Sequence, residues 1–122
     1  MPEVIAGECH CGAVSYKFNE TPEFAVECNC SICRRLGVHW IYGKRETVDI
    51  SAPQDGLINY IWGDKELVFH SCKTCGVTTH YTAANPEKHN AVVVNLKLAD
   101  PRHAKSIPLR HFDGAESWKF LD

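Results

Sequence analysis

The sequence lacks any long run of apolar residues. Its longest purely apolar run is Ala91–Val94, whereas a helix that spans a membrane needs about 20 such residues. The first residues, Met1–Ile5, show no basic stretch followed by an apolar one, so they do not resemble a secretion signal. We therefore expect a cytoplasmic protein that has no membrane partner.

The sequence also lacks an excess of positive charge. It contains 13 Lys and Arg against 15 Asp and Glu, which gives a formal net charge of −2 at pH 7. No long basic arm precedes Cys9. Affinity for a phosphate backbone comes mainly from clustered Lys and Arg. We therefore expect no nucleic-acid partner.

Long amphipathic helices and internal repeats are missing as well. The composition is otherwise that of an ordinary globular protein, with 44% hydrophobic and 23% charged residues. A chain of 122 residues corresponds to one domain. We expect a single domain over residues 1–122, mainly β and mainly antiparallel, in which metal supplies part of the stability.

Short extended segments separated by turn residues fill the sequence. Val14, Tyr16 and Phe18 alternate with other residues, as on a strand with one buried face. Ser31 can cap a single helical turn over residues 31–36, and Gly37 can end it. Further strands are expected at residues 24–27, at 38–42 and 46–50 on either side of Gly43, at 57–62 and 66–70 around a Gly63-Asp64 turn, and at 77–81, 92–94 and 107–112.

Cysteine is what the sequence has in abundance, with seven residues in 122. An odd number of cysteines in a chain without an export signal argues against a disulfide framework. Cysteines that lie close together on a tight turn can converge on one metal ion, and zinc takes four thiolates at about 2.3 Å in a tetrahedron. Zinc binding is therefore predicted from three tight groups: Cys9-x-Cys11, Cys28-x-Cys30-x-x-Cys33 and Cys72-x-x-Cys75.

Seven cysteines can be divided into a set of four and a set of three. Four thiolates close the coordination shell of a structural zinc, whereas three leave one position for water or substrate. The one contiguous group of three is Cys28, Cys30 and Cys33, which leaves the two pairs to share a closed site. Spacing leaves two alternatives open. Cys28 and Cys30 could join the pair at residues 72 and 75, or a histidine could complete the second site.

Three segments resemble one known family: residues 7–16 (GECHCGAVSY), 28–35 (CNCSICRR) and 72–76 (CKTCG). In this order they resemble the glutathione-dependent formaldehyde-activating enzyme family, to which centromere protein V also belongs. The resemblance covers roughly residues 5–82. It continues more weakly through Asn85-Pro86 and through Phe112-Asp113-Gly114…Trp118, which look most like the centromere protein V branch.

The resemblance implies a β-tent fold, in which antiparallel sheets meet around zinc. It also implies two zinc ions per chain. A structural zinc would be held by Cys9, Cys11, Cys72 and Cys75, and a second, catalytic-type zinc by Cys28, Cys30 and Cys33. The family reaction is a carbon–sulfur lyase activity that joins glutathione and formaldehyde into S-(hydroxymethyl)glutathione.

The sequence departs from the family pattern at two points. The chain is compact and lacks the extra segments that longer members devote to glutathione. Many members place the cysteine immediately after the aromatic residue, whereas this sequence reads Phe69-His70-Ser71-Cys72.

Several other side chains are candidates near the second zinc. One of Arg34 and Arg35 could stabilise thiolates and the other could pair with a substrate carboxylate, although both could equally be surface charges. His39 is the nearest candidate for a fourth ligand or a proton shuttle, and His10 lies where it could support the ligands of the first site. Four aromatic residues could line a pocket beside the second zinc: Trp40, Tyr42, Tyr60 and Trp62. Aromatic residues that alternate along strands are more often part of the hydrophobic core of a sheet.

The sequence therefore predicts a zinc-dependent lyase that acts on a small thiol adduct, with a thiol such as glutathione as its partner. Three thiolate ligands lower the Lewis acidity of zinc, which suits thiol exchange better than hydrolysis. The alternative is a non-catalytic zinc-binding module that binds or senses a thiol or a protein. A deep pocket at the group of three cysteines would favour the enzyme, and a shallow exposed site would favour the module.

Overall fold

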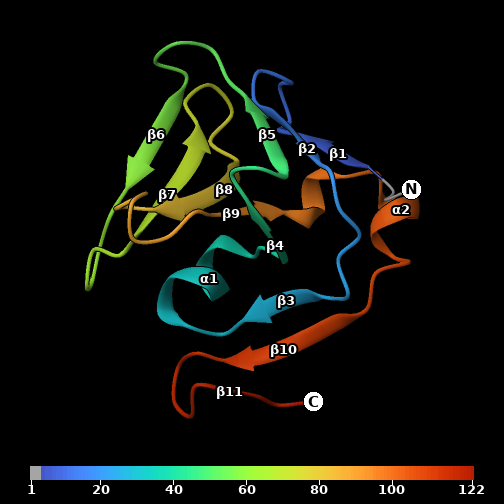
Figure 1. Ribbon diagram of the computed structural model, residues 1–122, viewed down its shortest axis with the longest axis vertical. Coiled ribbons are helices and arrows are strands. Elements are labelled where there is room, and N and C mark those ends of the chain that lie inside the picture. The colour runs from blue at the N-terminus through green and yellow to red at the C-terminus, as the bar shows by residue number, and fades with distance from the viewer. Residues whose placement is uncertain (1–3) are drawn as a thin grey trace.

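Strands make up most of the secondary structure of the computed structural model (Figure 1). The structure describes residues 4–122, so the first three residues of the segment inspected for a secretion signal lie outside it. Within the described range, none of the helices has the length and apolar character needed to cross a membrane. The predicted mainly β fold is confirmed, and its strands form two sheets.

The smaller sheet has three antiparallel strands, in the order β1-β2-β5. The alternation of Val14, Tyr16 and Phe18 predicted a strand with one buried face. Tyr16 and Phe18 lie in the middle strand, Val14 directly precedes it, and all three are buried. This prediction is therefore confirmed. The bounds are β1 Ile5–Glu8, β2 Ser15–Phe18 and β5 Val48–Ser51.

The larger sheet has eight strands, in the order β11-β10-β3-β4-β9-β8-β7-β6. Its neighbours are antiparallel except for β3 and β10, which run parallel and pair Ala25 with Leu109. The expected antiparallel arrangement therefore does not hold for this pair. The bounds are β3 Ala25–Cys28, β4 Trp40–Lys44, β6 Leu57–Tyr60, β7 Leu67–Cys72, β8 Thr78–Ala83, β9 Ala91–Asn95, β10 Leu109–Asp113 and β11 Lys119–Phe120.

Strand boundaries differ from the sequence-based prediction by up to two residues, and two of the differences involve a glycine. Strand β4 continues through Gly43, where the sequence predicted a break. The glycine is packed tightly, since a Cβ at this position would lie 2.5 Å from Val48 and 2.8 Å from the ring of Phe18 in the small sheet. Strands β6 and β7 form the expected hairpin, but the connection is a longer loop that begins after Tyr60 and has Gly63 at φ 63°.

The helices are short and flank the strands. Helix α1 (Ser31–Leu36) ends at Gly37, which has φ 67° as predicted. Its N-cap is Cys30 rather than the expected Ser31, because the sulfur of Cys30 accepts a hydrogen bond from the backbone N–H of Cys33. Two further turns were not predicted, η1 (Leu96–Leu98) and α2 (Pro101–Ala104).

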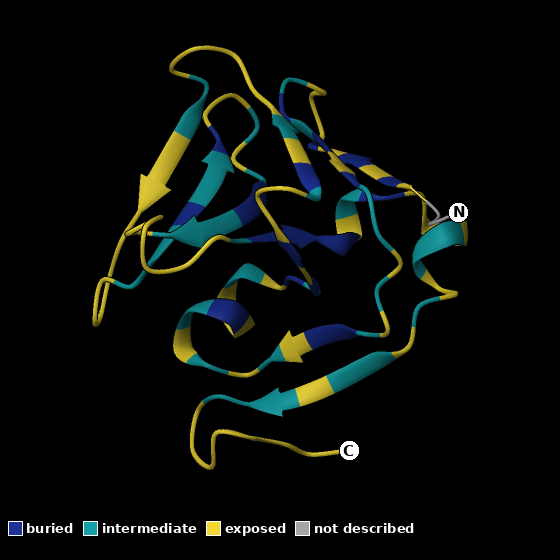
Figure 2. Cartoon of the chain, in the orientation of Figure 1, coloured by how far each residue is buried: buried dark blue, intermediate teal, exposed yellow. Residues whose placement is uncertain are grey.

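Buried residues are concentrated in the central strands, including β4 and β9 (Figure 2). Their side chains form separate clusters on the two faces of the large sheet. On one face, Ile41 and Val94 pack with Phe18 of the small sheet. On the other face, Trp40 and Phe69 pack with Cys33 of helix α1. A third, smaller cluster contains Val14, Cys9 and Cys72. The fold therefore places one group of cysteines in each of the two smaller cores.

Candidate functional site

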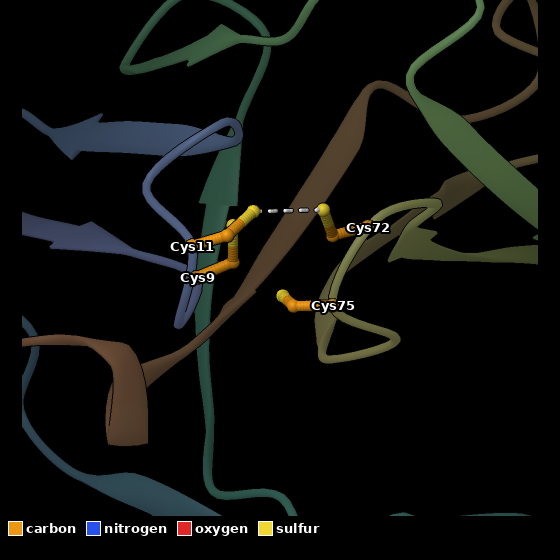
Figure 3. A group of neighbouring side chains, drawn as sticks. All are labelled: Cys9, Cys11, Cys72 and Cys75. Atoms are coloured by element: carbon orange, nitrogen blue, oxygen red, sulfur yellow. Dashed lines mark hydrogen bonds between the residues drawn. The ribbon is translucent and has the colours of Figure 1, made fainter.

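The four-cysteine group (Cys9, Cys11, Cys72 and Cys75) joins two turns. One turn connects β1 with β2, and the other connects β7 with β8, so that the four sulfurs point toward one another (Figure 3). All four sulfurs lie within 4.8 Å of one another, with 3.7 Å between the sulfurs of Cys9 and Cys11 and 3.6 Å between those of Cys11 and Cys72. A tetrahedral zinc with bonds of about 2.3 Å would hold its sulfurs about 3.8 Å apart. The group fits such an ion.

Backbone N–H groups of both turns point at the sulfurs. The N–H of Val14 donates to the sulfur of Cys9 over 3.3 Å. The N–H of Val77 lowers the pKa of Cys75 to about 6, and the N–H of Cys75 lowers the pKa of Cys72. Metals bind the thiolate form of cysteine. The turn between β7 and β8 therefore favours the form that a metal needs. At Cys11 the N–H of Ala13 lowers the pKa, but desolvation and the neighbouring thiols outweigh this and raise the pKa to about 11.

The triple-cysteine group (Cys28, Cys30 and Cys33) lies where strand β3 passes into helix α1. Its three sulfurs also lie within 4.8 Å of one another. The sulfur of Cys33 is buried and accepts a hydrogen bond from the indole N–H of Trp40 over 3.5 Å. Burial raises the pKa of Cys28 and Cys33. A metal would have to displace protons here, so its affinity would fall at low pH.

Among residues 4–122, no histidine belongs to either group that can hold a metal. His39, the candidate fourth ligand, instead places Nε2 3.0 Å from a carboxylate oxygen of Glu27. His10 is exposed in the turn between Cys9 and Cys11.

Sequence reasoning did not find the residues that fix the triple-cysteine group in place. The side chain of Asn29 donates to Asp113 Oδ1 over 2.9 Å, and its own oxygen accepts from the N–H of Ala115 over 3.0 Å. The bond from Asn29 lowers the pKa of Asp113. A Cβ on Gly114 would lie 2.7 Å from the sulfur of Cys28. The turn between β10 and β11 thus packs directly against the cysteines.

A cavity of about 900 Å³ adjoins the triple-cysteine group and not the four-cysteine group. Arg34 lines it, whereas the guanidinium of Arg35 donates to the carbonyl oxygen of Ser31 over 2.8 Å. Tyr60 lies outside the cavity and is exposed. Nine aromatic residues line the cavity: Phe24, Trp40, Tyr42, Trp62, Phe69, Tyr81, Phe112, Trp118 and Phe120. Three of the four aromatic residues proposed from sequence as core or pocket are among them.

The fold and its two thiol clusters define a small β protein that can hold metal ions, with a donor set compatible with zinc. Comparison with protein families gives a consistent result. Residues 4–112 match the family described as glutathione-dependent formaldehyde-activating enzyme, and the chain belongs to that family.

A solved structure supports the same fold. A crystal structure of a Rhodobacter sphaeroides protein superposes with a TM-score of 0.68 at 28% sequence identity, over 85% of this chain and 98% of that one. No curated protein matches the sequence.

Proposed function

We propose that the chain is a zinc-dependent carbon–sulfur lyase-type enzyme that joins a thiol to a small aldehyde. The family description suggests glutathione and formaldehyde as the reactants and S-(hydroxymethyl)glutathione as the product. One observation carries the proposal: the cysteine group that would leave a zinc position open is the one that lines the large cavity.

The proposal assigns different roles to the two groups. The four-cysteine group would hold a structural zinc, because four thiolates complete its shell. The triple-cysteine group would hold a second zinc, whose remaining position binds the substrate thiol as its reactive thiolate. Two zinc ions per chain would result.

Residues of the chain complete the site around the reacting atoms. Arg34 is the cation on the cavity wall that can offset negative charge at the thiolates. Tyr42 and Tyr81 also line the cavity, and burial raises the pKa of Tyr81. A tyrosine hydroxyl is neutral at pH 7 and can donate a hydrogen bond to the aldehyde oxygen. In the overall reaction the thiol sulfur bonds to the aldehyde carbon, and the proton lost from sulfur ends on the aldehyde oxygen.

The alternative function is a non-catalytic module that binds or senses a thiol or a protein. A module that binds a protein through an exposed face needs no large cavity beside its metal. The cavity volume of about 900 Å³ is within the range of small-molecule sites and favours the enzyme.

The test replaces one ligand of the triple-cysteine group, Cys30→Ser, and follows product formation from glutathione and formaldehyde by NMR. We expect the parent protein to accelerate the reaction and the variant to fall to the uncatalysed rate. Native mass spectrometry should count two zinc ions in the parent and one in the variant, and circular dichroism should show an unchanged fold. A folded variant with one zinc and full activity would contradict the assignment. A parent with two zincs that accelerates the reaction of formaldehyde with no thiol, glutathione or other, would support the binding module.

A further inference from the structure

The cavity beside the triple-cysteine group is lined mainly by aromatic side chains. All three tryptophans of the chain and four of its five phenylalanines lie on its wall. They come from separate parts of the fold, with Phe69 in β7, Phe112 in β10 and Trp118 in the turn before β11. Aromatic walls bind apolar groups, and above all other rings, by burial and by edge-to-face packing.

Several of these rings are exposed to solvent. Trp118 is 72% exposed, and Trp62 and Phe120 are 39% and 38% exposed. Two of these rings are nevertheless held in place: Trp118 and Phe120 each pack edge-to-face on Phe112, with 5.1 Å between ring centroids. Large apolar groups exposed on a fixed surface commonly mark a binding site. An apolar ligand would remove this surface from water.

Charged groups are scarce in the same cavity. Among the described residues that line it, Arg34 is the one basic side chain and Asp64 the one acidic side chain outside the cysteines. Asp64 also accepts a hydrogen bond from the backbone N–H of Glu66 within its own loop. Three thiolates around a divalent ion leave a net negative charge. The cavity thus offers a single guanidinium to a ligand that approaches a negative centre.

Glutathione does not match this lining well. It carries two carboxylates and one ammonium besides its thiol, and each charge that leaves water needs a partner. Arg34 can pair with one carboxylate, and the lining offers no second cation, so the other carboxylate gains nothing from the cavity and must stay in water. A thiol with an uncharged ring needs no such partners.

We infer that the cavity selects thiols with a neutral apolar group, preferably an aromatic ring, over glutathione. The inference rests on the proposed function, since it places the thiol end of the ligand at the triple-cysteine group. Burying a ring of this size is worth a factor of at least about ten in affinity.

The test measures binding to the zinc-loaded full chain by titration calorimetry, with tryptophan fluorescence as a second readout. Three thiols are compared: phenylmethanethiol, ethanethiol and glutathione. We expect phenylmethanethiol to bind at least about tenfold more tightly than either of the others. Trp118→Ala should weaken the binding of phenylmethanethiol and leave the binding of ethanethiol unchanged. Tyr60→Ala, which removes an exposed ring outside the cavity, should affect neither thiol.

The outcomes separate this inference from the proposed function. Glutathione binding as tightly as phenylmethanethiol would overturn the apolar preference and leave the thiol-binding site intact. Equal affinity of the parent and Trp118→Ala for phenylmethanethiol would also overturn it, because the ring of the ligand would then lie elsewhere. Failure of all three thiols to bind would overturn both proposals.

Discussion

At the scale of single residues, the triple-cysteine group depends on partners that are distant in sequence. Asn29 bonds to Asp113 and Ala115, and Gly114 lies against Cys28. These contacts orient the cysteines without contributing a ligand atom. Residues that support ligands in this way commonly change metal affinity by about 10- to 100-fold when they are replaced.

Gly114→Ala tests this packing. The new methyl group would occupy the position now close to the sulfur of Cys28, so that this side chain must rotate away from the other two cysteines. We expect one of two bound zincs to weaken by about 10- to 100-fold in chelator competition. The zinc at the four-cysteine group is the internal control and should be unchanged. Parental affinity for both ions would show that the close approach does not limit the site.

The cysteines themselves could be found from the sequence, whereas these supporting residues could not. The spacing of the cysteines allowed a division into a set of four and a set of three, and the family resemblance selected which cysteines form each set. Asn29 and Gly114 stand in segments that carry the family resemblance, but nothing in the sequence places them against the cysteines, because those contacts span more than 80 residues of chain. The sequence suggested His39 as a metal ligand and gave no sign of its partner in the structure, Glu27 of strand β3.

At the scale of elements, the four-cysteine group connects the two sheets. Cys9 and Cys11 follow a strand of the small sheet, and Cys72 and Cys75 follow a strand of the large one. The hydrophobic cluster around them is small. A metal at this position would therefore hold together elements that little else joins locally.

The two groups should differ in what their loss does to folding. A structural zinc supplies about 10–16 kcal/mol of apparent binding free energy, which matches or exceeds the net stability of about 5–15 kcal/mol of a typical domain. We expect Cys72→Ser to give an insoluble protein or one without a cooperative thermal transition. Cys33→Ser, its matched control, should remain folded by circular dichroism. Equal melting temperatures for Cys72→Ser and the parent would rule out the structural role of that group.

Most strands could be predicted as short extended segments between turn residues, and the elements that were missed have local causes. Strand β11 has two residues and follows a turn stabilised by Asp113, so its sequence shows no period. Helix α2 begins at Pro101. The pair Asp100-Pro101 is typical of a turn in sequence, but in the structure the side chain of Asp100 accepts a hydrogen bond from the backbone N–H of Arg102 and caps the helix. The N-cap of α1 was assigned one residue late because serine is the usual capping residue and cysteine is not.

At the scale of the whole molecule, the large sheet separates two environments. One face packs on the small sheet and the other carries the cavity. The parallel pairing of β3 with β10 brings the end of the chain beside the triple-cysteine group. Strand order and this pairing depend on contacts between distant segments, so alternation alone could not reveal them.

A buried histidine makes the stability of the molecule depend on pH. His80 is 3% exposed and stacks on His70, with 4.4 Å between ring centroids. Burial lowers the pKa of His80 from 6.5 to about 3. The unfolded chain therefore takes up a proton below about pH 6.5 while the folded chain does not. Stability is retained above that pH and lost as pH falls toward 3.

This effect can be measured by denaturant unfolding at a series of pH values. Between about pH 6.5 and 3, the free energy of unfolding should fall by up to about 1.4 kcal/mol per pH unit from His80 alone. His80→Gln should have a shallower pH dependence than the parent, and metal loss in acid should affect both proteins alike. Parallel curves for the two proteins would contradict this role of His80.

The order of the site residues along the chain has a consequence for synthesis. The four-cysteine group is complete once residue 75 has been made, whereas the wall formed by Gly114 and Trp118 comes last. A growing chain on the ribosome can therefore bring the four-cysteine group together well before its cavity closes. Until β10 pairs with β3, Cys28 and Cys30 lack the turn that packs against them in the finished protein. Newly made chains would then be most sensitive to oxidants at these two thiols.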